Sequence, residues 1–437
     1  MRKIFLLCAL CASVMMANAA IPGGLPGKFS VAAGKQVVFS QGNLQYRAED
    51  GLGYDSWKFA EDQWATVGAS NEYISATYTG WIDLFAWGTG DNPTSTSTDN
   101  GNYASFEEWG INVISNGGDA SGFWRTLSSE EWNYLLLERD NAFKLFGLGT
   151  VNGVHGFILL PDEWNLPSGR SFVPAENYSL EDKGTWWNNP SGDNFSKNSY
   201  GTLEWADMEE AGAVFFPVTG KRSETTFGLE EYGMYWSSTP KSDNTNYAHY
   251  FQFSASEAAN PTNSWNRSEG RAVRLVADDI EPIDEVSLTV EFPKAGDEVD
   301  GSEFYWSATG GPATITIPGS AHYRMQLYWF DSPSGMPIFD TEFAENTEYR
   351  LCISLYNNTG YYFNLPTASE LINGAAPGII SQNILNKQYY VTFTTGSIPT
   401  AIDETATDVK AVKRFRNGQL LIEKNGKFYN TVGAEVK

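Results

Sequence analysis

At 437 residues the chain is too long for one ordinary domain, so we expect about two or three. Its formal net charge of −24 argues against binding to nucleic acid and to anionic membrane surfaces, because both repel carboxylates. Aromatic residues make up 14% of the chain and supply a large hydrophobic core. After the N-terminus, no segment reaches the roughly 18 apolar residues that a membrane-spanning helix needs.

The N-terminus has the three parts of a secretory signal peptide. Arg2 and Lys3 form a positive region, residues 4–16 are mostly apolar, and Ala-Asn-Ala at 17–19 matches a cleavage site. We therefore expect cleavage after Ala19 and a protein that is secreted or displayed on the cell surface. Cys352 is the one cysteine left after cleavage, so we expect no internal disulfide and a fold stabilised by its core.

The local chemistry around residue 128 predicts a short helix. Ser128 and Glu131 have the spacing of a capping box, and Leu127 and Trp132 have the spacing of a hydrophobic staple. These signals predict a helix over about 129–139. A second helix-like piece lies at 203–210. Strand-like runs occur at 155–160, 213–218, 234–238, 247–253 and 272–276.

Composition changes twice along the second half of the chain. An acidic, proline-containing stretch at 277–282 marks the first boundary. Residues 284–396 then carry short β-patterned runs without a strong helix, which favours a β-sandwich of immunoglobulin-like pattern. Residues 397–437 read as a linker and a small basic module, in which Asn425-Gly426 predicts a β-hairpin.

The sequence offers little for catalysis or metal binding. Its three histidines, His155, His249 and His322, lack metal-site spacing, and no nucleophile elbow or phosphate-binding glycine loop occurs. We predict no catalytic residues, no cofactor and no metal. Calcium in the oxygen-rich loops 91–102 or 193–198 stays an alternative, although neither has the spacing of a dedicated calcium loop.

Two tryptophan-containing segments are candidates for ligand binding. One lies in the long irregular stretch 161–210, and we expect the other in a second loop. An aromatic ring offers a flat apolar face to a sugar ring or a peptide, while asparagine and arginine supply directional hydrogen bonds. The alternative is that the tryptophans anchor the loops onto the core. The candidate residues are Trp186, Trp187, Asn188, Trp265, Asn266 and Arg267.

The first part of the chain resembles known proteins. Trp124–Leu135 resembles the helix-opening signature of the formylglycine-generating-enzyme-like branch of the C-type-lectin fold, and Gly270–Val276 resembles its closing strand. Segments 37–46, 212–217 and 233–239 are similar to the major paralogous domain of Fibrobacter and Bacteroidota exported proteins. The resemblance implies a C-type-lectin-like α+β domain with long irregular loops over 20–278.

The known sites of that fold do not carry over to this sequence. Formylglycine-generating enzymes depend on a cysteine pair, and residues 20–278 contain no cysteine. The related iron-dependent sulfoxide synthases use three histidines, of which this part has His155 and His249. Calcium-dependent lectins use Glu-Pro-Asn or Gln-Pro-Asp with Trp-Asn-Asp, whereas here Trp265 and Asn266 precede Arg267. What the resemblance implies is a binding module.

Residues 417–433 are similar to a type IX secretion sorting tail, which implies export or attachment to the cell envelope. Taken with the signal peptide, this predicts an exported, non-catalytic protein that recognises a glycan or a surface protein through loops of its first domain. We expect no nucleic-acid partner and no membrane-spanning segment. The alternatives are a structural envelope protein that assembles with copies of itself and an enzyme that acts on polysaccharide.

Overall fold

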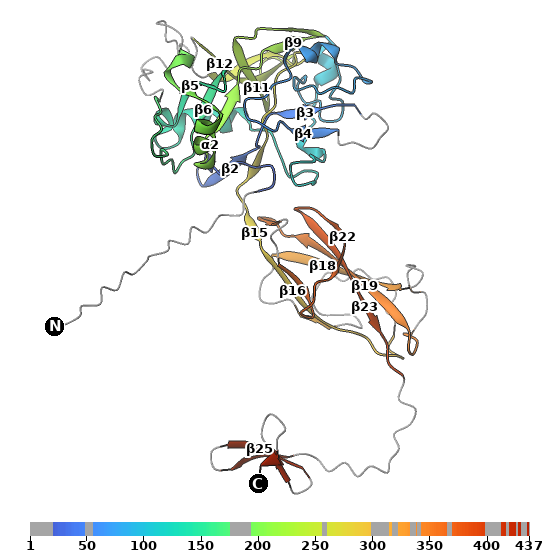
Figure 1. Ribbon diagram of the computed structural model, residues 1–437. Helices are drawn as coiled ribbons and strands as arrows, with labels where there is room; N and C mark the ends of the chain where they lie inside the picture. The colour runs from blue at the N-terminus through green and yellow to red at the C-terminus, as the bar shows by residue number, and fades with distance from the viewer. Residues whose placement is uncertain are drawn as a thin grey trace, which may run out of the picture. The chain divides into compact units, whose positions relative to one another are not determined.

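The described residues form mostly β-structure with few short helices and several small, mainly antiparallel sheets (Figure 1). The computed structural model describes residues 21–48, 56–174, 194–255, 260–298, 314–316, 322–332, 338, 342–364, 369–397, 412–416, 419–424, 427–429 and 435–436. The expected signal peptide and most of the expected linker lie outside them. None of the described helices is long and apolar enough to cross a membrane.

Contacts along the chain divide it into two compact units. The first comprises Met1–Glu291, Phe304–Tyr328 and Leu351–Val391, and the second comprises Phe292–Glu303, Trp329–Arg350 and Thr392–Lys437.

The first 280 residues contain the helices and five of the sheets. The helices are α1 (Ser129–Asn133), which continues as a π-helical turn (Tyr134–Glu138), α2 (Thr202–Glu210), and 3₁₀ turns at Gly68–Tyr73, Asn100–Tyr103, Trp109–Ile111, Ala142–Lys144 and Asn194–Lys197. The sheets, in strand order, are β1 (Phe29–Ala32), β2 (Lys35–Phe39) and β14 (Val276–Asp278); β3 (Leu44–Tyr46) and β4 (Trp57–Phe59); β7 (Ser199–Tyr200), β5 (Phe146–Val151), β6 (Val154–Leu159) and β8 (Val214–Pro217); β9 (Lys221–Ser223) and β10 (Thr226–Gly228); and β11 (Tyr232–Pro240), β12 (Tyr247–Ser254) and β13 (Asn260–Asn266).

The capping box at the start of α1 is confirmed. The Ser128 hydroxyl accepts from Glu131 N at 3.1 Å, and the Glu131 carboxylate accepts from Ser128 N at 2.9 Å. Leu127 and Trp132 are both buried in the same hydrophobic cluster, where the Trp132 ring stacks on Phe251 with centroids 4.7 Å apart. The sequence predicted the start of this helix correctly because all the partners in the capping box lie within a few residues of each other.

The predicted helix over about 129–139 is confirmed as far as Glu138, but its second half is π-helical rather than α-helical. After Asn133 the backbone widens into a π-helical turn, in which Arg139 N donates to Tyr134 O at 2.9 Å. The Arg139 side chain is buried at the end of this turn and donates to Asp162 Oδ1 and to Leu160 O, both at 2.9 Å. The wider turn thus ends at a residue that contacts Asp162 and Leu160, more than 20 positions further along the chain. No local sequence pattern predicts such a contact.

The other strand-like runs of the first part fare differently. Those at 155–160, 213–218, 234–238 and 247–253 correspond to β6, β8, β11 and β12, and the helix-like piece at 203–210 is α2. The run at 272–276 does not form one strand. Its residues change partner: Ala272 bonds with Met234 and Trp236, Val273 O accepts from Leu44 N, and Val276 begins β14.

Beyond residue 280 the described residues form strands joined by turns and loops, with no helix among them, as expected. In strand order the sheets are β15 (Glu281–Ile283) and β20 (Tyr361–Phe363); β17 (Thr314–Thr316), β16 (Glu285–Glu291) and β21 (Ser369–Ile372); β18 (Tyr323–Asp331), β19 (Glu348–Asn357), β23 (Asn386–Thr394) and β22 (Gly378–Gln382); and β24 (Val412–Arg416), β25 (Gln419–Lys424), β26 (Lys427–Tyr429) and β27 (Glu435–Val436). The hairpin around 425–426 is confirmed, since β25 pairs with β26 from Lys424–Lys427 to Ile422–Tyr429. The immunoglobulin-like character of residues 284–396 stays a prediction.

We expect Ser128→Ala to lower the free energy of unfolding by about 1 kcal/mol, because Glu131 N loses its acceptor at the helix start. Chemical denaturation of the wild type and the variant measures the difference. The exposed Ser75 provides a matched control, and Ser75→Ala should stay within about 0.5 kcal/mol of the wild type. Equal stabilities for all three proteins would contradict the role given to the capping box.

Candidate functional site

The structure describes three of the six residues that the sequence suggested for ligand binding. Trp186, Trp187 and Asn188 lie outside the described residues. We expected Trp265, Asn266 and Arg267 in a loop. Instead, Trp265 and Asn266 lie at the end of strand β13, and Arg267 follows directly. Strand β13 is the edge strand of the sheet β11–β12–β13.

Trp265 forms an exposed aromatic surface together with Tyr247. Its side chain is one of the few large hydrophobic groups that reach solvent, with 45% of its surface exposed. The indole stacks on the Tyr247 ring with centroids 5.7 Å apart and planes inclined by 26°. The Lys241 Nζ lies 5.9 Å from the centroid of the same tyrosine ring. We call Trp265 and Tyr247 the aromatic platform.

A partly buried ionic network holds the platform in place. Trp265 Nε1 donates to Glu269 Oε1 at 3.1 Å, and the same oxygen accepts from Lys221 Nζ at 2.7 Å. The other oxygen of Glu269 accepts from Arg271 at 3.1 Å. Arg271 is buried and lies 3.9 Å from the Tyr250 ring centroid, and its burial lowers the pKa of its guanidinium. The indole is thus oriented by a carboxylate that two cations fix.

Arg267 points into the protein rather than toward solvent. It is buried, its guanidinium lies 4.4 Å from the Trp87 ring centroid, and its Nε donates to Tyr247 O at 3.0 Å. Its Nη1 donates to the carbonyls of Tyr103 and Ala104 at 3.1 and 3.2 Å. Arg267 therefore ties the platform to the 100–104 segment and offers no free donor surface to a ligand.

Two asparagines flank the platform. Asn100 Nδ2 donates to Asn266 Oδ1 at 3.4 Å, and Asn100 Oδ1 accepts from Ser268 N at 3.1 Å. Each side-chain amide has capacity for further hydrogen bonds. Sequence reasoning missed Asn100, Tyr247 and Glu269 as neighbours of Trp265. Only the tertiary fold brings the oxygen-rich loop 91–102 to β13.

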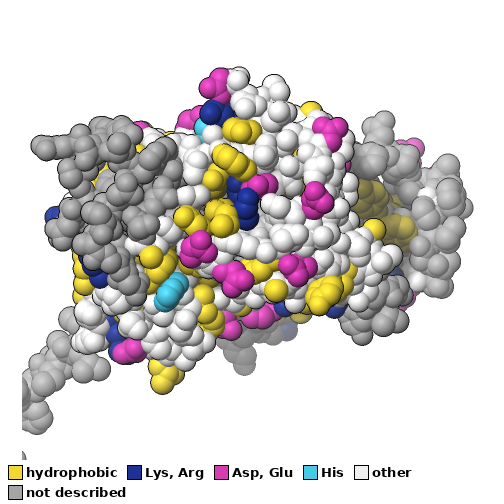
Figure 2. Space-filling model, turned by 90° about the horizontal axis from the view of Figure 1, so that it is seen from above, with side chains coloured by type: hydrophobic (Ala, Val, Ile, Leu, Met, Phe, Trp, Pro, Cys, Tyr) yellow, Lys and Arg dark blue, Asp and Glu magenta, His cyan; other side chains and the backbone are white. Residues whose placement is uncertain are grey.

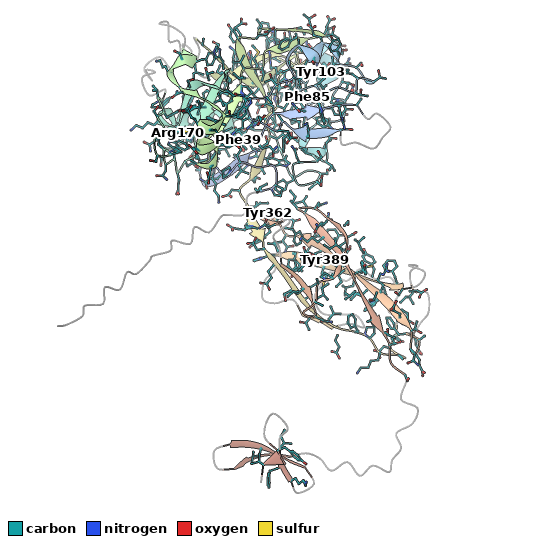
Figure 3. The ribbon with its side chains drawn as sticks, viewed as in Figure 1. Phe39, Phe85, Tyr103, Arg170, Tyr362 and Tyr389 are labelled. Atoms are coloured by element: carbon teal, nitrogen blue, oxygen red, sulfur yellow. The ribbon has the colours of Figure 1, made fainter. Side chains whose placement is uncertain are left out.

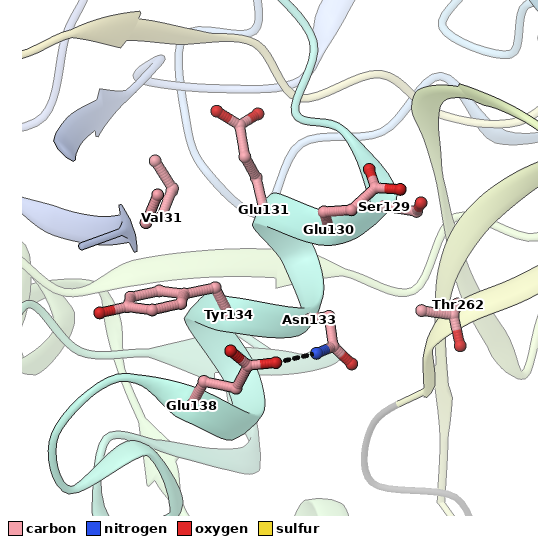
Figure 4. Close-up of a pocket in the computed structure, with 9 residues that line it drawn as sticks. Val31, Ser129, Glu130, Glu131, Asn133, Tyr134, Glu138 and Thr262 are labelled. Carbon is pink, nitrogen blue, oxygen red and sulfur yellow. Dashed lines mark hydrogen bonds between the residues drawn. The ribbon is translucent and has the colours of Figure 1, made fainter.

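A surface depression of about 410 Å³ lies beside the start of α1 (Figure 4). Carboxylates line its helix side, and Thr262 of β13 lies across from them. Glu131 is already bonded to Arg125 at 2.7 Å, and Glu138 accepts from Asn133 at 2.6 Å. Its lining residues are Val31, Ala32, Ser129, Glu130, Glu131, Asn133, Tyr134, Glu138 and Thr262.

Metal binding and histidine chemistry find little support in the described part of the chain. Within it, no group of three or more histidine, cysteine, aspartate or glutamate side chains is arranged to hold a metal ion. Asp193, at the start of the second oxygen-rich loop, lies outside the described residues. His155 stacks on Phe195 with centroids 4.6 Å apart, and His249 Nδ1 lies 3.0 Å from Thr262 O.

Asp83 is a fully buried carboxyl group in the first part of the chain. Its two oxygens accept from Asn71 Nδ2 and Val67 N, both at 2.8 Å. Burial removes water from the carboxylate and raises the pKa of Asp83 to about 6, although these hydrogen bonds oppose the shift. Asp83 thus accepts hydrogen bonds inside the fold, and ionisation of its carboxyl group lowers the stability of the protein.

Comparison with protein-family models, with curated proteins and with solved structures found no match for this chain.

We expect the wild type to lose stability relative to Asp83→Asn as pH rises from about 4 to 6. The folded protein holds the Asp83 proton up to about pH 6, whereas the unfolded chain releases it near 3.8. The predicted change is about 3 kcal/mol and levels off above pH 6. Urea denaturation at a series of pH values measures it. The same series on Ser75→Ala, at an exposed position without an ionisable group, gives the baseline, and a pH-independent difference between the wild type and Asp83→Asn would refute the shift.

Proposed function

We propose that this chain is an exported, non-catalytic binding protein whose first domain has a C-type-lectin-like fold and binds a glycan at the aromatic platform. The observation that carries the proposal is an exposed indole that is already oriented. A flexible surface tryptophan would lose rotamer freedom on binding, which weakens affinity. Trp265 is held by Glu269 and by the stack on Tyr247, so this cost is largely met in the free protein.

The neighbouring groups suit a sugar. The C–H face of a pyranose ring packs on an aromatic ring, and its hydroxyls need donors and acceptors at the rim. Asn266 and Asn100 supply side-chain amides at that rim. Figure 2 shows many acidic side chains and few basic ones on the face that is seen from above. Together with the net charge of −24, this favours a neutral glycan over an anionic one.

In this proposal the β-strands of the second half act as a spacer, and the C-terminal module serves export or attachment to the envelope.

Self-assembly of an envelope protein is the second candidate, and one observation favours it. Ile379 and Ile380 on β22 are 49% and 52% exposed, and β22 is the edge strand of its sheet. Exposed, uncharged edge strands pair readily with other chains. Analytical ultracentrifugation of the mature protein tests this directly: a strict monomer at high concentration speaks against assembly, and a concentration-dependent oligomer speaks for it.

We expect Trp265→Ala to weaken glycan binding about tenfold or more, which corresponds to about 1.4 kcal/mol. A glycan array first identifies the ligand of the mature protein, and calorimetry then compares the variants. Tyr73→Ala is the matched control, because Tyr73 is also exposed and packs on Tyr78 with ring centroids 5.8 Å apart.

The two parts of the proposal fail separately. If the array and a protein pull-down both find no ligand, the binding function is wrong. If a ligand is found and Trp265→Ala binds it as tightly as Tyr73→Ala and the wild type, the function stands and the platform is wrong.

A further inference from the structure

A buried lysine joins two sheets of the second half of the chain. Lys387 lies on β23, in the sheet β18–β19–β23–β22, and Glu370 lies on β21, in the sheet β17–β16–β21. The Lys387 ammonium forms an ion pair with Glu370 Oε1. The Lys387 side chain is 1% exposed and that of Glu370 is 15% exposed, so water has little access to the pair.

The surroundings of this pair are aromatic. The Lys387 Nζ lies 5.8 Å from the Phe363 ring centroid, and Tyr389 is fully buried on the same strand as the lysine (Figure 3). Tyr389 follows Lys387 by two residues on β23, so both side chains lie on the same face of the strand, the face that meets Glu370. Burial and the Glu370 charge raise the pKa of Tyr389, so its hydroxyl keeps its proton and is available as a donor.

Burial makes the charged form of this pair energetically costly. Two charges taken out of water lose their hydration, and attraction between them often fails to compensate. Transfer of one proton from the ammonium to the carboxylate would give a neutral amine facing a neutral acid, the pair from which an amide can form. Groups held in contact react as if present at effective concentrations of about 10⁵–10⁸ M. Proximity thus favours condensation.

We propose that Lys387 and Glu370 are joined by an intramolecular amide bond. The neutral Nζ attacks Cδ of the Glu370 acid, and the C–N bond forms. A second proton moves from nitrogen to the departing hydroxyl, the C–O bond breaks, and one water leaves. Of the three ammonium protons, one stays on the amide nitrogen and two depart in the water. No oxidant or external reactant is needed, and the chain keeps its net charge.

Tyr389 has a positioning and polarising role in this step. Its hydroxyl donates to the Glu370 oxygen on which negative charge develops during the attack, as a preorganised donor does in acyl transfer. The resulting cross-link ties β21 to β23. A chain with Cys352 as its one cysteine after signal cleavage cannot obtain such a tie from an internal disulfide.

Mass spectrometry of the mature protein, purified from its culture and denatured, tests the bond. We expect an intact mass lower than the sequence mass by one water. Trypsin should fail to cut after Lys387, because the modified side chain no longer fits the enzyme. Leu351–Lys410 then appears as one peptide that lacks a water, and fragmentation yields no backbone fragments between 370 and 387.

The variants decide where the water was lost. Lys387→Met and Glu370→Met should both restore the full mass, Tyr389→Phe should lower the cross-linked fraction, and Lys294→Met, at an exposed lysine, should keep the deficit. Because a variant that does not fold would also lack the bond, the assignment depends first on the wild-type peptides. A wild type of full mass that is cut after Lys387, or a deficit that persists in Lys387→Met, overturns the proposal.

Discussion

Burial of guanidinium groups among aromatic rings is the constraint on which the first part of the structure depends. Arg271 lies against Tyr250 and Trp236, with its Cζ 3.9 and 4.9 Å from the ring centroids. Arg274 donates to Gln63 at 3.1 Å and to Asn43 at 3.4 Å, and burial lowers its pKa to about 10, so it stays charged at neutral pH. A buried cation without partners costs several kcal/mol. Each arginine therefore fixes the segments that supply its partners.

The segment 270–276, which contains both arginines, connects the buried core with the exposed aromatic platform. Residues 270–276 exchange backbone hydrogen bonds with Arg222, Phe85, Met234, Trp236 and Arg125, which lie in four different parts of the chain. At its start, Glu269 accepts from Arg271 on one oxygen and from Trp265 on the other. The orientation of the exposed indole is thus set from the core. A binding surface built in this way needs no ordering of its own when a ligand arrives.

The second half of the chain also buries a charged side chain, but here it is a lysine. Its strands bury Lys387 and Tyr389 between sheets and contain the lone Cys352. A covalent tie between Lys387 and Glu370 would remove two buried charges and join the sheets in one step. In both halves, buried polar groups specify which distant segments meet, while the aromatic rings supply most of the buried area.

The sequence alone determined the elements whose partners are close along the chain. The capping box at Ser128, the helix α2 and the hairpin between β25 and β26 all depend on residues within a few positions of each other. Only the tertiary structure decided the π-helical turn before Arg139, the inward direction of Arg267 and the meeting of Trp265 with Tyr247, Glu269 and Asn100. Side-chain direction and long-range hydrogen bonds decide these features, and neither leaves a periodic trace in the sequence.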